Sequence, residues 1–331
     1  MEKLLDEIES YWSTRTEGYS EVNHKELAGT QKNAWLKVLT SQFPDKPKEE
    51  IRILDIGTGP GFFPVILAEA GYHVDAVDYT EGMLEKAKEN AGELCRNIRF
   101  WRMDAQKLDF EDNTFDVVIS RNLTWNLEHP DVAYREWVRV LKVGGKLLNF
   151  DANWYGYLYE EEQRKAYEND RKNVENNSLD DHYLCTDIER MERIALQVPL
   201  SKIRRPEWDV KTLREAGLLG IHTDTEIWKT VWSEEERLNY QSTPMFMVTG
   251  VKPDHFLNLP VAAGEKTEGF LELGDGEFVL PATIIRGKDQ GKTVLVTAGL
   301  HAGEYVGIQT LIELSKRLKP EKVKGQLVLV K

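Results

Sequence analysis

Short apolar runs separated by helical stretches make up the first half of the chain. The runs predict strands, and they fall at 53–55, 72–77, 98–103, 115–120 and 147–150. Helices are predicted between them, most clearly at 63–68 and 132–141. Strands that alternate with helices are typical of a parallel sheet covered on both faces, so the sequence predicts an α/β fold.

The segments around this core complete the predicted outline. The first 50 residues have an amphipathic helical pattern, and 160–177 is a highly charged helix with little apolar face. We interpret 155–206 as an insertion between the fifth strand and the next helix. The remaining elements follow in chain order: a short helix at 208–216, a strand at 221–232, a polar connection at 233–242 and a last strand at 244–251.

The most informative stretch is ILDIGTGPG at 53–61, where an apolar run ends in an acid and opens into Gly57, Gly59 and Gly61. Glycines let the backbone turn sharply and let a ligand approach the main chain with no Cβ in the way. The next helix offers unpaired N–H groups and the positive end of its dipole. Asp78 ends the second predicted strand, where an acid can accept hydrogen bonds from ribose hydroxyls. These features predict a nucleoside-containing cofactor, and a turn that binds nothing is the alternative.

The glycine spacing distinguishes between cofactors. The dinucleotide fingerprint G-x-G-x-x-G requires a third glycine where this chain has Phe62, which disfavours a nicotinamide oxidoreductase. The loop instead resembles motif I of the class I S-adenosylmethionine (SAM)-dependent methyltransferases, D-x-G-x-G-x-G, which is intact here as Asp55, Gly57, Gly59 and Gly61. The order of the predicted elements is similar to that family throughout residues 50–151.

This resemblance implies a Rossmann-like, doubly wound sheet of seven strands with an antiparallel last strand and a helical cap insertion at about 155–206. It also implies SAM as cofactor and S-adenosylhomocysteine (SAH) as product. Asp78 would hold the ribose hydroxyls, Asp104 the adenine amino group, and the three glycines the methionine moiety. The other residues implied at the cofactor are Tyr19, Asp55, Thr58, Tyr79, Met83, Ala105, Gln106, Ser120 and Arg121.

Aromatic residues flank the predicted core on both sides. Trp12 and Tyr19 lie in the N-terminal helical segment, where they either pack in the core or form a lid over the cofactor. Trp154 and Tyr155 begin an aromatic stretch after the fifth strand, which either lines an apolar acceptor pocket or anchors the next helix. The candidates for the substrate pocket are Trp12, Trp125, Trp154 and Tyr155.

No catalytic base stands out in the sequence. His24 and His129 are candidates only because their segments are expected near the pocket mouth. A dedicated base is needed only if the acceptor must lose a proton in the transfer step. The catalytic residues and the methylated atom therefore stay open at this stage.

The length, charge and hydropathy of the chain limit which kinds of molecule it is expected to bind. The chain of 331 residues is long enough for about two domains, and its net charge of −13 argues against a nucleic-acid substrate. No apolar run approaches the ~20 residues of a membrane helix, and the acidic start lacks the apolar core of a secretory signal. Cys95 and Cys185 are expected as free thiols. We therefore expect a cytoplasmic enzyme that acts on a small molecule, with no membrane partner.

The end of the chain has a different character. A strand at 293–298, a loop with His301 and Glu304, and an amphipathic helix at 305–318 resemble the opening of the aspartoacylase/succinylglutamate desuccinylase family of zinc hydrolases. The resemblance implies that His301 and Glu304 are zinc ligands, whereas that family's third ligand lies farther downstream than this chain extends. Catalytic zinc needs three protein ligands, so stable zinc binding and hydrolysis are not expected of this chain alone.

These observations predict four segments: an N-terminal helical lid at 1–50, a SAM-binding domain at 51–252, a linker at 253–262 and a partial zinc-hydrolase-like α/β segment at 263–331. We predict in-line methyl transfer from SAM to a small molecule. The alternatives are a zinc amidohydrolase fragment fused to a methyltransferase and a non-catalytic SAM-binding protein. A final strand at 325–330 would leave exposed sheet edges, from which we expect a homodimer.

Overall fold

The computed structural model describes residues 4–183, 186–256, 259–273, 278–299 and 305–331. It divides into two compact units, of which the first holds Met1–Ala216 and Ile221–Gly250 and the second holds Gly217–Gly220 and Val251–Lys331. Within the described residues, no helix is both long and apolar enough to cross a membrane.

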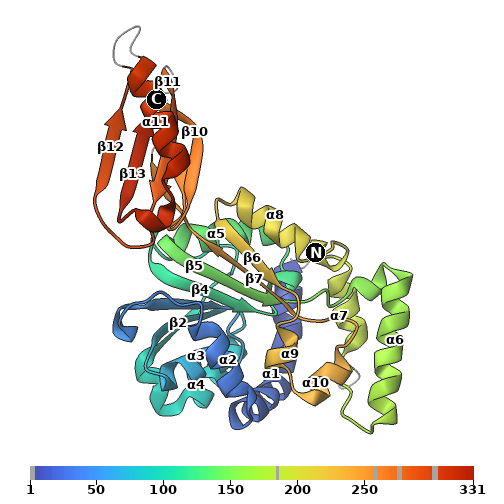
Figure 1. Ribbon diagram of the computed structural model, residues 1–331. Coiled ribbons are helices and arrows are strands. Elements are labelled where there is room, and N and C mark those ends of the chain that lie inside the picture. Colours follow the sequence, from blue (N-terminus) through green and yellow to red (C-terminus); the bar gives the residue numbers. More distant parts are fainter. Residues whose placement is uncertain (1–3, 184–185, 257–258, 274–277, 300–304) are drawn as a thin grey trace. The chain divides into compact units, whose positions relative to one another are not determined.

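A seven-stranded sheet forms the centre of the first unit, in the order β3-β2-β1-β4-β5-β7-β6 (Figure 1). Strands β1 to β5 pair in parallel, and the mixed sheet includes one antiparallel strand, which confirms the predicted Rossmann-like fold class. The strand bounds are Arg52–Ile56 (β1), His73–Asp78 (β2), Ile98–Arg102 (β3), Phe115–Arg121 (β4), Leu141–Asp151 (β5), Leu219–Asp224 (β6) and Phe246–Val251 (β7).

The strand order reverses between β1 and β4, and this reversal positions the site. The pairs Ile56↔Val77 and Ile56↔Ser120 show that β1, β2 and β4 end side by side at one edge of the sheet. In open α/β sheets, ligands bind in the crevice at the carboxyl ends of the strands where the order reverses. The glycine-rich loop follows β1 directly, so it lies at this edge.

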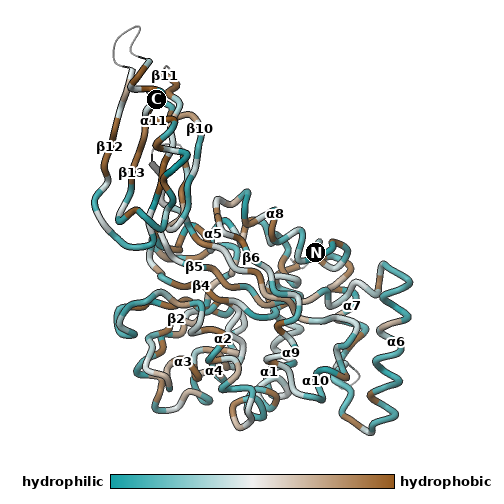
Figure 2. The backbone as a smooth tube through the Cα atoms, in the orientation of Figure 1, coloured by the Kyte–Doolittle hydropathy of each residue, from teal (hydrophilic) through white to brown (hydrophobic). Residues whose placement is uncertain are grey.

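Helices cover the sheet of the first unit. Trp35 of α2 is fully buried, and its ring meets Phe63 of α3 and Phe150 of β5 edge to face at 5.1 and 5.0 Å. Figure 2 shows hydrophobic strands in the sheet and a largely hydrophilic α6, as the sequence predicts. The helix bounds are Leu4–Ala28 (α1), Gln31–Thr40 (α2), Phe62–Glu69 (α3), Glu81–Ala91 (α4), Pro130–Val140 (α5), Glu161–Asn176 (α6), Ile188–Ala195 (α7), Glu207–Glu215 (α8), Trp228–Val231 (α9) and Glu234–Asn239 (α10).

Two predicted elements at the end of the first unit are wrong. The strand predicted at 221–232 ends at Asp224, and Trp228–Val231 form helix α9. Ile227 and Val231 are both buried and lie four residues apart, which is the helical rather than the strand period. The connection predicted at 233–242 contains α10, which begins with a reciprocal capping box between Ser233 and Glu236.

A third difference concerns residues 142–146, which precede the strand predicted at 147–150. These residues belong to β5, which begins at Leu141. The pairing of β4 with β5 shifts register between Phe115 and Val117, so the strand contains an irregularity where the glycines stand.

The second unit contains a four-stranded sheet in the order β10-β11-β13-β12. Strand β13 pairs in parallel with β12 and antiparallel with β11, and α11 connects β12 to β13. Ile284 and Ile285 of β11 are both fully buried, in apolar clusters on opposite faces of the sheet. The bounds are Asp254–Phe256 (β8), Leu259–Val261 (β9), Lys266–Leu273 (β10), Phe278–Arg286 (β11), Thr293–Thr297 (β12), Tyr305–Arg317 (α11) and Gln326–Val330 (β13).

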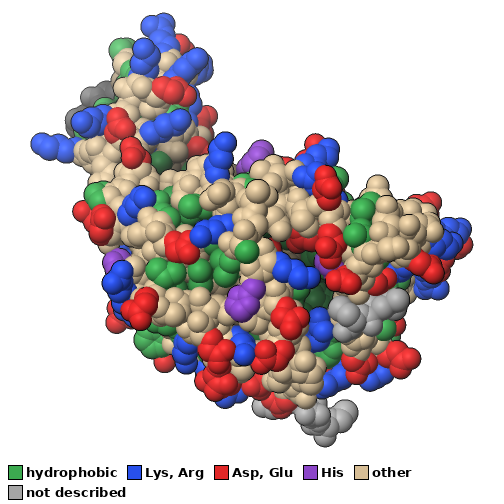
Figure 3. All heavy atoms as spheres, turned by 90° about the horizontal axis from the view of Figure 1, so that it is seen from below, with side chains coloured by type: hydrophobic (Ala, Val, Ile, Leu, Met, Phe, Trp, Pro, Cys, Tyr) green, Lys and Arg blue, Asp and Glu red, His purple; other side chains and the backbone are tan. Residues whose placement is uncertain are grey.

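The strand predicted at 293–298 and the helix predicted at 305–318 correspond to β12 and α11. Strands β10 and β12 are the edges of this sheet, and Val294 and Leu295 of β12 are exposed. On the face drawn in Figure 3, acidic and basic side chains are interspersed. The homodimer and the exclusion of nucleic acid stay predictions.

Candidate cofactor and acceptor cavities

A cavity opens at the carboxyl ends of β1, β2 and β4, and we call it the first cavity. It holds about 1090 Å³ of empty space, including the open space at its mouth. The predicted cofactor residues that line it are Tyr19, Asp55, Gly57, Thr58, Gly59, Asp78, Tyr79, Met83, Asp104, Ala105, Gln106 and Arg121. Gly61 and Ser120 do not line it.

The glycines of the loop have different local roles. At Gly59, φ is +53°, and an added Cβ would have only the Tyr19 ring at 3.8 Å near it, so the main chain faces open space. At Gly61, φ is +91°, and an added Cβ would lie 3.0 Å from the Ala87 Cβ. Gly61 therefore allows α4 to approach the loop, and Ser120 is likewise structural because its hydroxyl donates to the Ile56 carbonyl at 2.9 Å.

Asp78 is fixed at the end of β2 by two backbone donors. Its Oδ2 accepts the Gly59 N–H at 2.8 Å, and its Oδ1 accepts the Thr80 N–H at 2.9 Å. Burial raises the pKa of this carboxyl, and the two N–H groups oppose that shift. Each carboxylate oxygen has a second acceptor site, so Asp78 can also accept from hydroxyls of a ligand in the cavity.

Asp104 and Gln106 line the cavity beyond β3. Asp104 Oδ1 accepts the Gln106 N–H at 2.9 Å, and Gln106 Oε1 accepts the His129 N–H at 2.6 Å. Trp137 of α5 donates from its indole nitrogen to the Ala105 carbonyl at 2.9 Å. These contacts hold the loop of residues 103–106 against α5, with Asp104 at the wall of the cavity.

A second cavity lies beside the first and encloses about 1880 Å³, again including its open mouth. The two cavities share part of their wall, formed by Trp12, Tyr19, Asn23, Arg121 and Asn122. All four predicted substrate-pocket residues line the second cavity: Trp12, Trp125, Trp154 and Tyr155. Tyr11, Tyr183, Trp232 and Tyr240 add further aromatic surface.

The shared wall is held by a two-point ion pair between α1 and the end of β4. Arg121 Nη1 and Nη2 lie 2.8 and 2.9 Å from the two carboxylate oxygens of Glu26. The guanidinium also stacks over the Phe62 ring, with its centre 4.8 Å from the ring centroid. This pair ties α1 to the sheet, and Trp12 and Tyr19 of α1 line both cavities rather than fill them.

Neither histidine that the sequence offered as a base lines a cavity. His24 is exposed, and its Nε2 lies 2.7 Å from Asn90 Oδ1. His129 is also exposed and takes part through its backbone N–H. The histidine that lines the second cavity is His182, whose ring bonds Glu235 and Tyr240. No local sequence pattern predicts this role of His182, because its partners Glu235 and Tyr240 are 53 and 58 residues away in the chain.

The first cavity contains acceptors that the described protein residues do not satisfy. The amide oxygens of Asn23, Asn122 and Asn126 are buried and lack a hydrogen-bond partner in the described part of the chain, and all three residues line the cavity. Buried polar atoms are normally paired. A ligand rich in donors fits them, and SAM supplies an ammonium, two ribose hydroxyls and an adenine amino group.

Comparisons with known proteins agree with this geometry. Residues 54–149 match the family model of a methyltransferase domain. The demethylmenaquinone methyltransferase of Clavibacter sepedonicus is 39% identical over 97 residues, which cover 29% of this chain and 39% of that protein. The enzyme of the same name from Renibacterium salmoninarum is 31% identical over 148 residues, 45% of this chain and 60% of that protein.

Phosphoethanolamine N-methyltransferase 2 of Haemonchus contortus, solved with SAM, has a similar fold. Its TM-score is 0.50 at 20% identity, over 67% of this chain and 53% of that chain. These findings support a class I SAM-dependent methyltransferase domain in this chain. The chain spans 60% or less of the length of the two curated relatives.

The described residues of the second unit give no support for a metal centre. Within the described ranges, no three His, Cys, Asp or Glu side chains are grouped so that they could hold a metal ion. His301 and Glu304 lie outside the described residues, as does Cys185, so the expectation that this chain alone does not bind zinc stably stays a prediction. Cys95 is a free thiol, as expected.

We expect Asp55 to make cofactor binding sensitive to pH. Burial raises the pKa of its carboxyl to about 7, with Arg121 opposing the shift, so much of it is protonated at neutral pH. The ammonium of SAH, bound in the first cavity, would favour the ionised form of Asp55. We expect SAH affinity measured by calorimetry to rise as pH increases from about 6 to 8, by up to about tenfold. In Asp55→Asn this dependence should flatten, and an equally steep profile in that variant would contradict the role of Asp55.

Proposed function

We propose that this chain transfers the methyl group of SAM to a small molecule bound in the second cavity. The observation that carries the proposal is that the first and second cavities lie side by side and share a wall of Trp12, Tyr19, Asn23, Arg121 and Asn122. The names of the two curated relatives and of the solved neighbour describe methylation of two small molecules, demethylmenaquinone and phosphoethanolamine.

SAM supplies a sulfonium-bound methyl group, which a nucleophile displaces in line. The residues of this chain bind and orient. Asp78 accepts from the ribose, Asp104 faces the adenine, and the open main chain at Gly59 accommodates the methionine moiety. Trp12 and Tyr19 cover the junction of the two cavities, where they would exclude water and align the acceptor with the methyl carbon.

Calorimetry with SAH and with NAD tests the cofactor assignment. We expect SAH to bind at one site per chain with a dissociation constant on the order of micromolar, about −8 kcal/mol. NAD should give no saturable heat, because Phe62 occupies the position of the third glycine in the dinucleotide fingerprint. If SAH gives no saturable heat, the methyltransferase proposal fails.

The alternative of a non-catalytic SAM-binding protein would be favoured by a blocked pocket. Both cavities instead contain open space beside Trp12 and Tyr19. An acceptor site with room for a substrate supports catalysis over simple binding. No observation on the described residues favours a hydrolase as a second candidate.

A further inference from the structure

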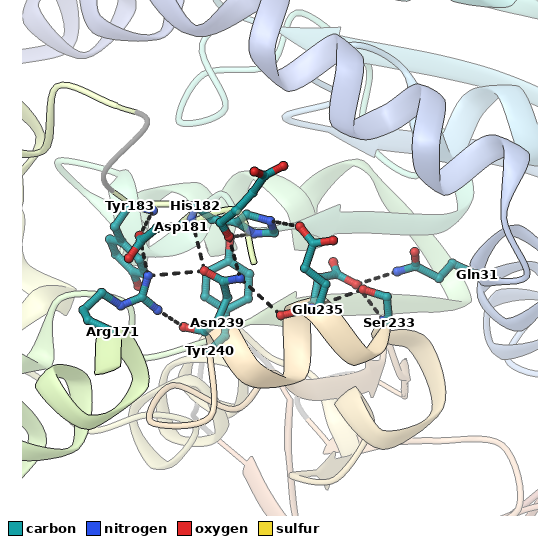
Figure 4. Close-up of polar contacts among 11 residues, drawn as sticks. Gln31, Arg171, Asp181, His182, Tyr183, Ser233, Glu235, Asn239 and Tyr240 are labelled. Atoms are coloured by element: carbon teal, nitrogen blue, oxygen red, sulfur yellow. Dashed lines mark hydrogen bonds and ion pairs between the residues drawn. The ribbon is translucent and has the colours of Figure 1, made fainter. Parts of the chain in front are cut away.

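His182 stands at the centre of a row of hydrogen bonds in the wall of the second cavity (Figure 4). Its Nε2 lies 2.8 Å from Glu235 Oε1, and its Nδ1 lies 2.9 Å from the Tyr240 hydroxyl. An ionised carboxylate can only accept, so the partners assign the proton to Nε2. Nδ1 is then the basic nitrogen and accepts the hydroxyl proton of Tyr240.

Tyr240 is the member of this hydrogen-bonded row that lies among the aromatic residues lining the second cavity. Its ring packs edge to face on Trp154 at 5.2 Å and lies 5.6 Å from Trp232, and all three residues line the second cavity. Burial raises the pKa of Tyr240 well above its usual value. The hydroxyl therefore stays protonated, and it can give its proton to His182 only as it receives another.

Neighbouring polar residues fix the position of His182, and Glu235 is the group that can neutralise a positive charge on its ring. Asn239 Oδ1 accepts the backbone N–H of His182 at 3.1 Å and a guanidinium N–H of Arg171 at 3.2 Å. Arg171 also forms an ion pair with Asp181 at 2.6 Å, so the charges of these two residues offset each other. Glu235 of α10 is the charged partner of the ring, Arg171 and Asp181 lie beside the His182 backbone, and Asp180 and Glu236 line the same cavity.

We propose that Tyr240, His182 and Glu235 form a proton relay for an acceptor that is an aromatic hydroxyl compound. The proposal rests on the methyltransferase function above and specifies its acceptor. Tyr240 is the residue that touches the acceptor hydroxyl, and His182 and Glu235 act through it. Tryptophan and tyrosine side chains line part of the cavity wall, and they match a flat aromatic ring.

The hydrogen-bond directions define the path of the proton that the acceptor loses during methyl transfer. The acceptor oxygen forms a bond to the methyl carbon as the carbon–sulfur bond breaks, and that electron pair stays on sulfur. The acceptor proton passes to the Tyr240 oxygen, and the Tyr240 proton passes to His182 Nδ1. The resulting imidazolium is paired with the Glu235 carboxylate, and the proton later returns to solvent. A hydroxyl acceptor needs such a base because its neutral oxygen is a weak nucleophile.

The test is the ionisation of 4-nitrophenol bound to the SAH complex, because the colour of this probe reports its phenolate form. At a pH where free probe is mostly neutral, the wild-type complex should raise the phenolate-to-phenol ratio. His182→Gln and Tyr240→Phe should each lower that ratio by about tenfold. Glu235→Gln keeps an acceptor for Nε2–H but removes the charge that stabilises the imidazolium, so it should also lower the ratio.

Tyr159→Phe is the matched control. It removes a tyrosine hydroxyl that lines neither cavity and donates to the Leu196 carbonyl at 3.3 Å. The control should keep the wild-type ratio. Thermal unfolding of each variant separates loss of the relay from loss of the fold, and Tyr240→Phe preserves the ring packing.

The outcomes separate this inference from the function on which it rests. SAH binding with an equal phenolate ratio in wild type, His182→Gln and Tyr240→Phe would overturn the relay and leave the methyltransferase proposal standing. SAH binding with no saturable binding of 4-nitrophenol would overturn the aromatic hydroxyl acceptor. Absence of SAH binding would overturn both.

Discussion

Asp78→Ala is expected to weaken SAH binding by at least about 100-fold while the protein remains folded. The carboxylate has acceptor sites directed at the first cavity, and each hydrogen bond to a charged group contributes about 1.5–3 kcal/mol. Two ribose hydroxyls then account for about 3 kcal/mol or more, and each 1.4 kcal/mol is tenfold in affinity. Calorimetry with SAH and far-UV circular dichroism on the same sample measure the two parts of this prediction.

Asp75→Asn provides the control on the same strand. Asp75 is also buried, but its oxygens bond Arg99 and the Trp101 indole at 2.7 and 2.8 Å, and it does not line the first cavity. The substitution should reduce thermal stability and leave SAH affinity within about twofold, since no ligand contact is lost. Equal loss of affinity in both variants would show that Asp78 acts through the strand rather than through the ribose.

The fold and the cofactor cavity could be predicted from the sequence because their signals are local. Gly57, Gly59 and Asp78 mark a strand, a turn and a second strand end within a few tens of residues, and parallel pairing brings them to one edge. The sequence motif alone does not show which of its residues contact a ligand and which are needed for packing. Gly61 and Ser120 belong to the same pattern, but their surroundings are Ala87 and the Ile56 carbonyl.

The acceptor side could be predicted only in part, because its contacts are long-range. Trp125 and Trp154 follow strand ends, and this position, together with the aromatic stretch that begins at Trp154, predicts them in the pocket. His182 was missed because its chemistry depends on Glu235, which stands in a region without apolar periodicity. The capping box Ser233–Glu236 was a readable signal for α10, and with it the helix that presents Glu235 could have been found.

Arg205→Met is expected to lower the free energy of unfolding by about 3–5 kcal/mol. The Arg205, Asp151 and Asp209 side chains are all fully buried. Arg205 donates to Asp151 Oδ2 at 2.6 Å and to the two oxygens of Asp209 at 2.7 and 2.9 Å. Methionine fills a similar volume but leaves two carboxylates without their cation in an apolar interior. Urea unfolding followed by tryptophan fluorescence measures the loss.

The loss of unfolding free energy in Arg205→Met should increase with pH, and the substitution should also affect acceptor binding in the second cavity. Burial raises the pKa of Asp151 and Arg205 opposes that shift, so removing the cation penalises the ionised form that prevails at higher pH. Asp151 also accepts the Trp154 indole N–H and the Trp125 backbone N–H, each at 3.0 Å. Because both tryptophans line the second cavity, Arg205→Met should weaken acceptor binding even under conditions where the variant stays folded.

Arg204→Met is the matched control for this prediction. Arg204 precedes Arg205 in the chain, but its side chain is 79% exposed and lies 3.8 Å from Glu160. Exposed ion pairs contribute little, so the control should change the free energy of unfolding by no more than about 0.5 kcal/mol. If the two variants unfold at the same urea concentration, the buried cation is not what holds the strand end at Asp151, and the aromatic wall of the acceptor cavity is positioned by packing alone.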